Sequence, residues 1–336
     1  REFLLSSAAK LEFDCFPQKD IPSKRVFLDA KLSTTIFFGT KETGLKLSKQ
    51  NFIIRTYPAN TFRDDHKECI IELKDLKAID PNNFPIPLID NLNWKLLRKI
   101  HTKDGVKNLG AVQDFVIRRG EINQTIFKEF IEEENTGNER LIKGVQIGQY
   151  RFNKKLSQGK VEWFNEKKFL KNKSQRAVAT FERIATQRIT GVDEKLRIVA
   201  NIIEPKAYFA DSTNSIHIEV NSFYKLNYLL GLLNSKLWQW RFKLTSTNNN
   251  VGTNELEALP MKVIDFDNRS DTVLYDELTQ LVEIMLQLNK EKQQTTPSEK
   301  LEQLKARIQY TDDKINKLVY RLYGLSEEEV RVVEGR

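Results

Sequence analysis

Residues 274–288 read LYDELTQLVEIMLQL, and residues 301–322 read LEQLKARIQYTDDKINKLVYRL. In both stretches apolar side chains recur at three- and four-residue spacing, which places them on one face of a helix. Two such faces cover each other only if the chain turns back between them. The sequence therefore predicts a helical hairpin within residues 271–336. The heptad-like spacing leaves one alternative open, a free-standing coiled coil that oligomerises.

Three short motifs predict where these helices begin and end. Residues 296–299, Thr-Pro-Ser-Glu, fit a capping box with proline at the first helical position, so the second long helix is expected to start there. Gly324 suits a C-terminal cap because glycine adopts the left-handed conformation that ends many helices. Residues 326–329 form a second capping box and predict a short last helix.

The region before the hairpin, residues 90–268, combines short strands with one long apolar stretch. Strands are predicted over residues 111–117, 197–203 and 217–220, where β-branched and aromatic residues gather between turn-forming residues. Residues 224–242 carry leucines along one side of a helix, and we predict one buried helix there. This region is therefore expected to be a mixed α/β domain.

Residues 1–85 have the pattern of an α/β fold. Short β-branched and aromatic runs at 25–28 and 34–38 are typical of buried strands, and a third run covers 69–73. Three prolines between residues 81 and 87 mark a boundary, because proline lacks the amide donor that helices and sheets need. We expect an α+β chain in three parts, 1–85, 90–268 and 271–336.

The composition favours a folded protein with a polyanionic partner. Of the 336 residues 40% are hydrophobic, which is enough to bury a core, and 54 Lys and Arg against 46 Asp and Glu give a net charge of +8. Clustered cations bind phosphates by releasing the counterions that surround a nucleic acid.

The scarcity of cysteines and the lack of long apolar runs indicate the cellular compartment. Its two cysteines and three histidines have no zinc-ligand spacing, and so few cysteines favour a reducing compartment. No apolar run reaches the length of a membrane span, and no signal peptide opens the chain. We expect a cytoplasmic protein without a membrane partner. Because the chain opens on Arg1 and not on methionine, we also expect a fragment of a longer protein.

Basic residues concentrate in residues 151–176. Only Glu162 and Glu166 oppose the nine cations there, and five aromatic residues are interleaved with them. Cations of this kind hold phosphates, and aromatic rings stack on bases. The alternative is a solvated basic face with its aromatic rings turned inward. Arg183 and Arg188 extend the stretch, which favours nucleic acid. Its basic members are Arg151, Lys154, Lys155, Lys160, Lys167, Lys168, Lys171, Lys173 and Arg176.

Two further segments are candidate DNA contacts. Arg118 and Arg119 end a predicted strand, where they are placed to bind phosphate. A polar loop follows the predicted helix, and asparagine, serine and threonine side chains hydrogen-bond bases in the major groove. An ordinary asparagine-rich turn is the alternative. The loop residues are Thr245, Ser246, Thr247, Asn248 and Asn249.

Motifs for catalysis or for a cofactor are not recognisable in the sequence. No glycine-rich fingerprint follows a strand and opens a helix, so we expect neither a catalytic nor a cofactor-binding residue in this chain. Glu72 and Lys74, with Asp64 and Asp65 upstream, loosely imitate a Mg²⁺-dependent nuclease motif, in which carboxylates hold the metal and a lysine stabilises charge. A strand with solvent-facing charges explains the same pattern more simply.

Six stretches resemble a known family. Residues 313–330 are similar to the ending of type IIG restriction–modification enzymes and related adenine-specific DNA methyltransferases. Residues 228–237 and 256–261 resemble parts of the TaqI-like C-terminal specificity domain of those enzymes, and residues 119–123 and 142–150 match its opening strands more loosely. The segment after Arg119 lacks a second glycine that many relatives carry. Residues 1–40 resemble the last strands of the methyltransferase domain.

The resemblance implies a function for each part. Residues 1–85 would be the C-terminal remnant of a methyltransferase α/β domain, residues 90–268 a target recognition domain for duplex DNA, and residues 271–336 a hairpin that braces it. The parent would be a bacterial type II methyltransferase subunit that methylates adenine with S-adenosylmethionine, and Mg²⁺ would serve a nuclease domain of the parent. Double-stranded DNA and the remainder of the parent chain would be the partners. A Mg²⁺-dependent nuclease at Glu72 and Lys74, or a DNA-independent helical scaffold, are the alternatives.

Overall fold

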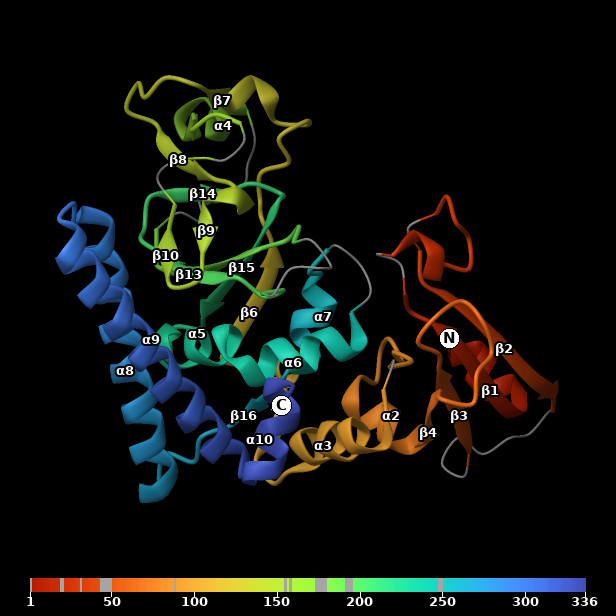
Figure 1. The fold of residues 1–336 in the computed structure, drawn as a ribbon. Helices are drawn as coiled ribbons and strands as arrows, with labels where there is room; N and C mark the ends of the chain where they lie inside the picture. Colours follow the sequence, from red (N-terminus) through yellow and green to blue (C-terminus); the bar gives the residue numbers. More distant parts are fainter. Residues whose placement is uncertain are drawn as a thin grey trace. The chain divides into compact units, whose positions relative to one another are not determined.

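The computed structural model describes residues 2–18, 21–30, 32–42, 50–87, 89–153, 156, 159–172, 180–190, 196–246 and 250–336 (Figure 1). The chain forms two compact units. Unit 1 comprises Arg1–Asn108 and Glu327–Arg336, and unit 2 comprises Leu109–Ser326. The mixed α/β architecture, with several sheets and long C-terminal helices, confirms the predicted fold class.

Unit 1 contains a four-stranded sheet in the order β2-β1-β3-β4. Strands β1 and β3 run parallel, and the other two pairs are antiparallel. The strands are β1 (Ala8–Phe16), β2 (Thr34–Lys41), β3 (Asn51–Thr56) and β4 (Lys67–Glu72). The other elements of unit 1 are α1 (Glu2–Ser7), η1 (Pro22–Lys24), α2 (Leu73–Ile79), α3 (Asn91–Thr102), β5 (Val106–Asn108) and α10 (Glu327–Glu334).

The two faces of this sheet differ in chemistry. One face is apolar, because Phe13, Phe52 and Ile71 occupy alternating positions and are buried. On the other face Arg55 joins three strands, with its Nη1 2.7 Å from Glu12 and its Nε 3.0 Å from Glu68. Alternation with a period of two thus divides core from surface, as expected of a sheet with one covered face.

Two of the strand predictions in unit 1 need correction. Residues 25–28 form no strand after η1, and residues 26–28 are exposed, with Phe27 61% and Leu28 62% exposed. A strand needs a neighbour, and β2 and β3 already occupy both edges of β1. The strand predicted at 34–38 is present as β2, but it is an edge strand with Phe37 and Phe38 exposed rather than a buried one.

Unit 2 is built on two four-stranded sheets. The first is antiparallel throughout, in the order β13-β12-β15-β6, and the second has the order β14-β8-β11-β7. The first consists of β6 (Phe115–Arg119), β12 (Arg183–Gln187), β13 (Ala200–Ile203) and β15 (Thr213–Ile218). The second consists of β7 (Ile131–Glu132), β8 (Glu139–Ile142), β11 (Glu162–Phe164) and β14 (Ala207–Phe209).

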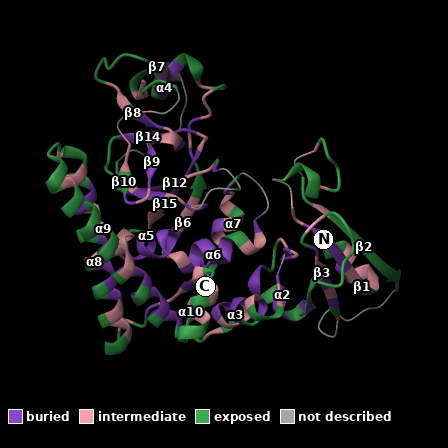
Figure 2. Ribbon diagram, viewed as in Figure 1, coloured by how far each residue is buried: buried purple, intermediate pink, exposed green. Residues whose placement is uncertain are grey.

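Shorter elements connect and cover these sheets. Strands β9 (Ile147–Gly148) and β10 (Arg151–Phe152) form a separate pair. The remaining elements before the hairpin are η3 (Leu109–Ala111), η4 (Lys128–Phe130), η5 (Gly144–Gln146), α4 (Glu166–Asn172), α5 (Leu226–Asn234), α6 (Lys236–Thr245), α7 (Thr253–Glu257) and β16 (Pro260–Lys262). The burial colours of Figure 2 show that α5 and α6 are largely buried.

The long helix predicted over 224–242 is two helices. Ser235 has an extended backbone, ends α5 and caps α6, since its Oγ accepts from the amide of Trp238 at 3.3 Å. The same Oγ donates to the carbonyl of Leu232 at 2.7 Å. A serine side chain that hydrogen-bonds the ends of both helices competes with the backbone hydrogen bonds of one continuous helix, so the chain bends here.

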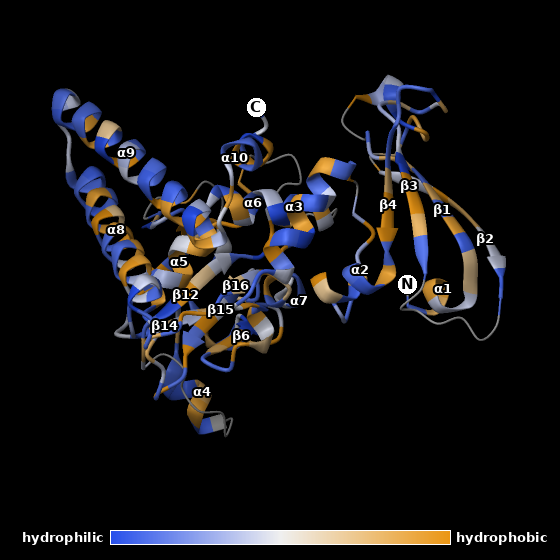
Figure 3. Ribbon diagram, turned by 90° about the horizontal axis from the view of Figure 1, so that it is seen from below, coloured by the Kyte–Doolittle hydropathy of each residue, from blue (hydrophilic) through white to orange (hydrophobic). Residues whose placement is uncertain are grey.

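The predicted helical hairpin is present as α8 (Arg269–Gln294) and α9 (Ser298–Tyr323). Figure 3 shows hydrophilic and hydrophobic residues side by side along both helices, as expected of amphipathic helices. Helix α8 packs on α5, where a Cβ added at Gly231 would lie 3.0 Å from Val282. From α9, Asn316 Oδ1 accepts from the amide of Lys236, and Tyr323 Oη accepts from Trp238 Nε1 at 3.1 Å. The hairpin therefore packs within unit 2.

The helix ends confirm one predicted cap and correct another. Gly324 adopts φ +60°, and its amide and that of Leu325 bond back to α9. The capping box at 296–299 does not form. Pro297 is the N-cap residue, no side chain caps the helix, and α9 starts at Ser298, so Thr296 lies one residue too far out to reach the first turn.

Candidate nucleic-acid interface

Arginines gather where β6 and β12 end. Arg118 and Arg119 are exposed at the end of β6, and Arg119 Nη2 lies 3.1 Å from Asp211 Oδ2. Arg188 directly follows β12, and its Nη1 donates to the carbonyl of Asp211 at 3.3 Å. Burial, reinforced by the charge of Arg119, lowers the pKa of Arg188 below its ordinary value. Two guanidinium groups therefore share one acidic turn, whereas Arg118, the neighbouring residue of β6, points to the opposite face of the sheet.

Two further segments join this cluster. Ile189 is 64% exposed and forms a β-bridge with Asn250. The amide of Val251 donates to the carbonyl of Arg188 at 2.7 Å. The segment after β12 and the segment that closes the polar loop therefore lie side by side. We call the set Arg119, Arg188, Ile189, Asp211 and Asn250 the arginine surface.

The arginine surface has the chemistry of a nucleic-acid contact. Two arginines meet one aspartate, so the net charge is positive. Arginine forks bind phosphate or the edge of guanine, an asparagine amide can pair with adenine, and an exposed aliphatic side chain can contact a thymine methyl group. The segments come from residues far apart in sequence, and the antiparallel sheet brings them to one place.

Part of this surface belongs to a recognisable family domain. Residues 139–261 match the family model of the TaqI-like C-terminal specificity domain. The match includes Arg188, Ile189 and Asn250 of the arginine surface and ends before the hairpin begins. We call this part of the chain the specificity domain. The family model therefore agrees with the resemblance at 228–237 and 256–261.

Three of the solved structures that match this chain do so at low sequence identity. The type IIL restriction–modification enzyme MmeI in complex with DNA is 11% identical, with a TM-score of 0.49, and the match covers 98% of this chain and 45% of the MmeI chain. A type I restriction–modification complex is 13% identical, with a TM-score of 0.37, and covers 63% and 46%. The HsdS subunit from Thermoanaerobacter tengcongensis is 13% identical, with a TM-score of 0.33, and covers 75% and 50%. The chain thus spans half or less of these structures. No curated protein sequence matches the chain.

The polar loop of the specificity domain is anchored from below by two buried arginines. Arg241 Nη1 donates to Thr245 Oγ1 at 2.7 Å, and Arg197 Nη2 donates to Ser246 Oγ at 3.4 Å. Ser246 is only 6% exposed, so its hydroxyl points into the protein, and the prediction that it contacts DNA is wrong for this structure. Thr247, Asn248 and Asn249 lie outside the described residues.

The basic segment separates into exposed cations and buried rings. Lys167, Lys168 and Lys171 are exposed on α4, and Arg151 is exposed on β10. Lys168 Nζ donates to the carbonyl of Glu129 at 3.0 Å and lies 5.7 Å from the centre of the Phe130 ring, so part of its charge is used locally. Four predicted contacts lie outside the described residues, namely Lys154, Lys155, Lys173 and Arg176.

The interleaved aromatic residues do not offer stacking faces. Tyr150, Phe164 and Phe169 are buried, and the two phenylalanines pack on each other with ring centres 5.0 Å apart. Phe152 and Trp163 are half-buried. The rings of the three buried residues are therefore turned inward, and Phe164 and Phe169 belong to the core cluster of the second sheet.

Arg183, which extends the basic stretch in the sequence, is structural. It is 3% exposed, and its Nη1 bonds the Glu121 carboxylate at 3.1 Å. Its guanidinium also lies 4.0 Å from the centre of the Phe209 ring. Arg183 therefore contacts the core of unit 2, and only Arg188 of the pair is placed for a ligand.

Residues of the nuclease alternative form ion pairs with neighbouring side chains. Lys74 Nζ lies 2.6 Å from Glu72 Oε2, and this pairing lowers the pKa of Glu72. Asp65 pairs with Arg63 at 3.0 Å. Within the residues that the structure describes, no group of three His, Cys, Asp or Glu side chains could hold a metal ion.

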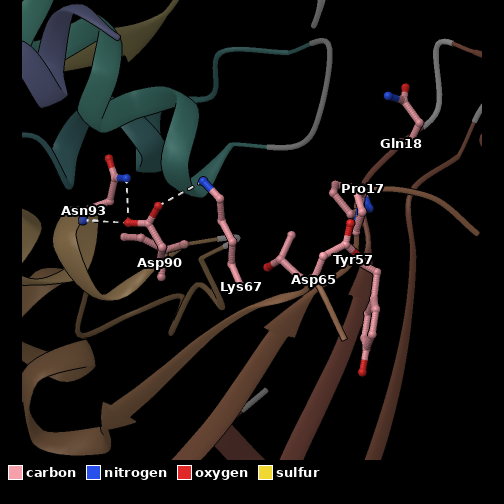
Figure 4. A pocket seen from close by; sticks show the side chains of 10 residues that line it. Pro17, Gln18, Tyr57, Asp65, Lys67, Asp90 and Asn93 are labelled. Atoms are coloured by element: carbon pink, nitrogen blue, oxygen red, sulfur yellow. Dashed lines mark hydrogen bonds and ion pairs between the residues drawn. The ribbon is translucent and has the colours of Figure 1, made fainter. Parts of the chain in front are cut away.

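Unit 1 has one further opening of interest, at the carboxyl ends of its parallel strands. Figure 4 shows this pocket, of about 490 Å³, lined by Pro17 after β1 and Tyr57 after β3. Lys67 Nζ lies 3.1 Å from Asp90 Oδ2, and Asn93 Nδ2 donates to Asp90 Oδ1 at 2.7 Å. The charged groups on its wall are therefore already paired.

No helix among the described segments is long and apolar enough to cross a membrane.

Proposed function

We propose that unit 2 reads a specific sequence in duplex DNA, as the target recognition module of a bacterial restriction–modification adenine methyltransferase of type II. The observation that carries this proposal is the match of residues 139–261 to the TaqI-like C-terminal specificity domain. The arginine surface supports it, since that surface combines cations with an exposed amide and an exposed aliphatic side chain at one site.

The exposed residues divide into two tasks. Cations on phosphates fix the register of the duplex and carry no sequence information, whereas polar and apolar contacts to base edges select the sequence. We assign Lys167, Lys171 and Arg151 to the first task, because they are exposed cations. We assign Arg188, Ile189 and Asn250 to the second.

Methylation itself would take place elsewhere in the parent protein. A catalytic domain with S-adenosylmethionine would act on an adenine turned out of the stack, because the target amine is unreachable within the duplex. This module would hold the duplex during that step. A nuclease domain of the parent would use Mg²⁺.

Binding at several salt concentrations tests the proposal against its alternatives. We expect the 336-residue chain to bind duplex DNA with an affinity that falls linearly in the logarithm of salt concentration, by about 0.9 per phosphate contact. Affinity that does not respond to salt, or no binding, would favour a helical scaffold. Mg²⁺-dependent nicking that disappears in Glu72→Gln would instead favour the nuclease alternative.

A further inference from the structure

A polar notch lies where β10 meets the turn of the hairpin. It has a volume of about 650 Å³ and is lined by Arg151, Asn153, Asn289, Lys292, Gln293 and Thr295. Leu301 at the start of α9 completes the wall. Two cations and several amides line the notch, and among the residues that the structure describes no carboxylate does. Figure 1 shows β10 beside this end of the hairpin, and α8 contacts β10.

The β10 side of the notch is held in a fixed orientation. Arg151 Nε donates to Asn153 Oδ1 at 3.2 Å. Asn153 is itself fixed, because its amide donates to the carbonyl of Gln146 at 2.7 Å and its Nδ2 to that of Val145 at 3.4 Å. Among the described residues none accepts from Nη1 or Nη2 of Arg151. The two terminal nitrogens form the fork that binds a phosphate with two parallel hydrogen bonds.

The hairpin side is tied to the same strand. Gln293 Nε2 donates to the carbonyl of Phe152 at 2.7 Å, which joins the end of α8 to β10. Asn289 is 5% exposed, and its Nδ2 donates to the carbonyl of Met285. Thr295 Oγ1 donates to the carbonyl of Glu291. These bonds fix the backbone around Lys292 and leave its ammonium as the charged donor on this wall.

We propose that this notch binds a phosphodiester group of the recognised duplex, so that the hairpin contacts DNA as well as stabilising unit 2. The inference rests on the proposed function. Positive charge without a carboxylate, on a rigid frame, is what a phosphate requires and what a cation or an apolar peptide would not select.

The notch would give the duplex a second backbone contact, separate from the arginine surface. Strand β10 lies beside β13, whereas Arg119 of the arginine surface ends β6 at the opposite edge of the same sheet and Arg188 follows the intervening strand β12. Three strand spacings separate those edges, about 14 Å at about 4.8 Å each. Two contacts this far apart fix the direction of the duplex, which one cluster does not.

The test uses the full chain with Arg151→Gln and Lys292→Gln together. We expect unchanged sequence preference, a lower affinity for every duplex, and a salt slope reduced by about two contacts, or about 1.8 in the logarithmic plot. Lys317→Gln is the matched control, since this lysine is exposed on α9 about 24 Å of helix from Leu301. The control is expected to change neither affinity nor slope.

A duplex probe tests the position directly. Methylphosphonate substitution removes the charge of one phosphate at a time. We expect one position at which the substitution weakens duplex binding by the wild type but not by the double variant. If the double variant binds with wild-type affinity and salt slope, the inference is overturned. The proposed function stands in that case, because the wild type still binds duplex DNA. Loss of sequence preference in the double variant would also overturn it, since a phosphate contact carries none. If the wild type binds no duplex, the proposed function fails and the inference with it.

Discussion

Unit 2 contains two groups of arginines that the sequence alone does not separate. The first group is buried, and each guanidinium meets fixed acceptors or a ring, as Arg183 does with Glu121 and Phe209. The second group is exposed at strand ends. The buried members are Arg183, Arg197 and Arg241. The exposed or half-exposed members discussed above are Arg118, Arg119, Arg151 and Arg188.

The difference teaches what burial does to a cation. A buried guanidinium uses its donors inside the protein, and removing it leaves its partners without a hydrogen bond. An exposed guanidinium keeps donors for a phosphate or a base. Substitution in the first group should therefore change stability, and substitution in the second should change DNA binding.

The largest effect is expected from removing the hairpin. Cutting the chain after Asp271 removes the helices that cover α5 and α6, including the bond from Trp238 to Tyr323. Each buried leucine stabilises the fold by roughly 1.5–3 kcal/mol, and the loss of several exceeds the roughly 5–15 kcal/mol of a typical domain. We expect the truncated chain to lose its cooperative thermal transition. A truncated chain that melts at the same temperature, together with a hairpin peptide that forms a stable helical oligomer, would contradict bracing within the chain.

The next largest effect is expected at a buried arginine. Arg183→Met should lower the free energy of unfolding by about 3 kcal/mol, because it leaves the Glu121 carboxylate near the core without its cationic partner. Glu121 keeps 22% of its side chain exposed, which limits the loss. Urea unfolding measures it, and adding Glu121→Gln should restore part of the stability. An equal loss in Arg118→Met would remove the distinction between the two groups.

The exposed group should show the opposite behaviour. Arg118→Gln, Arg119→Gln and Arg188→Gln together should leave the unfolding free energy within about 1 kcal/mol, since the ion pair with Asp211 is partly exposed. The variant should lose affinity for the preferred duplex more than for others, by about 1–3 kcal/mol per base contact. Competition binding with two duplexes measures this.

The lysines on α4 provide the comparison for that experiment. Replacing Lys167, Lys168 and Lys171 with Glu should weaken binding to all duplexes about equally and reduce the salt slope by roughly one unit for each contact. Lys168 should contribute least, because it already bonds the carbonyl of Glu129. Unchanged affinity and slope would show that α4 faces solvent or another domain.

The smallest effect is a shift in the titration of His217. Burial, with the charge of Arg118 as the second cause, lowers the pKa of this imidazole. A phosphate bound to Arg118 would offset part of that charge, so DNA binding should raise the pKa of His217. Histidine resonances measured by NMR over a pH series, with and without duplex, report the shift. A pKa that falls or does not move on binding would remove Arg118 from the interface.

The sequence predicts the hairpin well because its signal is local. The apolar spacing in 274–288 and 301–322 specifies helix and contact face together, and Gly324 specifies the end. The alternation of Leu11, Phe13 and Cys15 with acidic residues marks β1 in the same way, although it was not among the predicted strands. Ser235 was missed because the leucine pattern continues across it.

The candidate site is harder to predict because it depends on distant partners. Arg183 and Arg188 look alike in sequence, but Glu121 and Phe209, which bury the first, come from other segments of the chain. Ile189 and Asn250 carry no signal of their own, and only the bridge between their segments brings them to the arginine surface. Ser246 looks like a loop residue until the buried Arg197 beneath it is known.

Selection from a random duplex library tests the central claim most directly. The 336-residue chain is mixed with the library near physiological salt, at about 0.15 M, and the retained duplexes are sequenced. A specificity domain predicts enrichment of one discrete motif, bound about a thousandfold or more above random duplex. The motif should survive replacement of the α4 lysines and fade in the triple arginine variant. A retained pool as random as the input would contradict the claim that unit 2 reads DNA sequence.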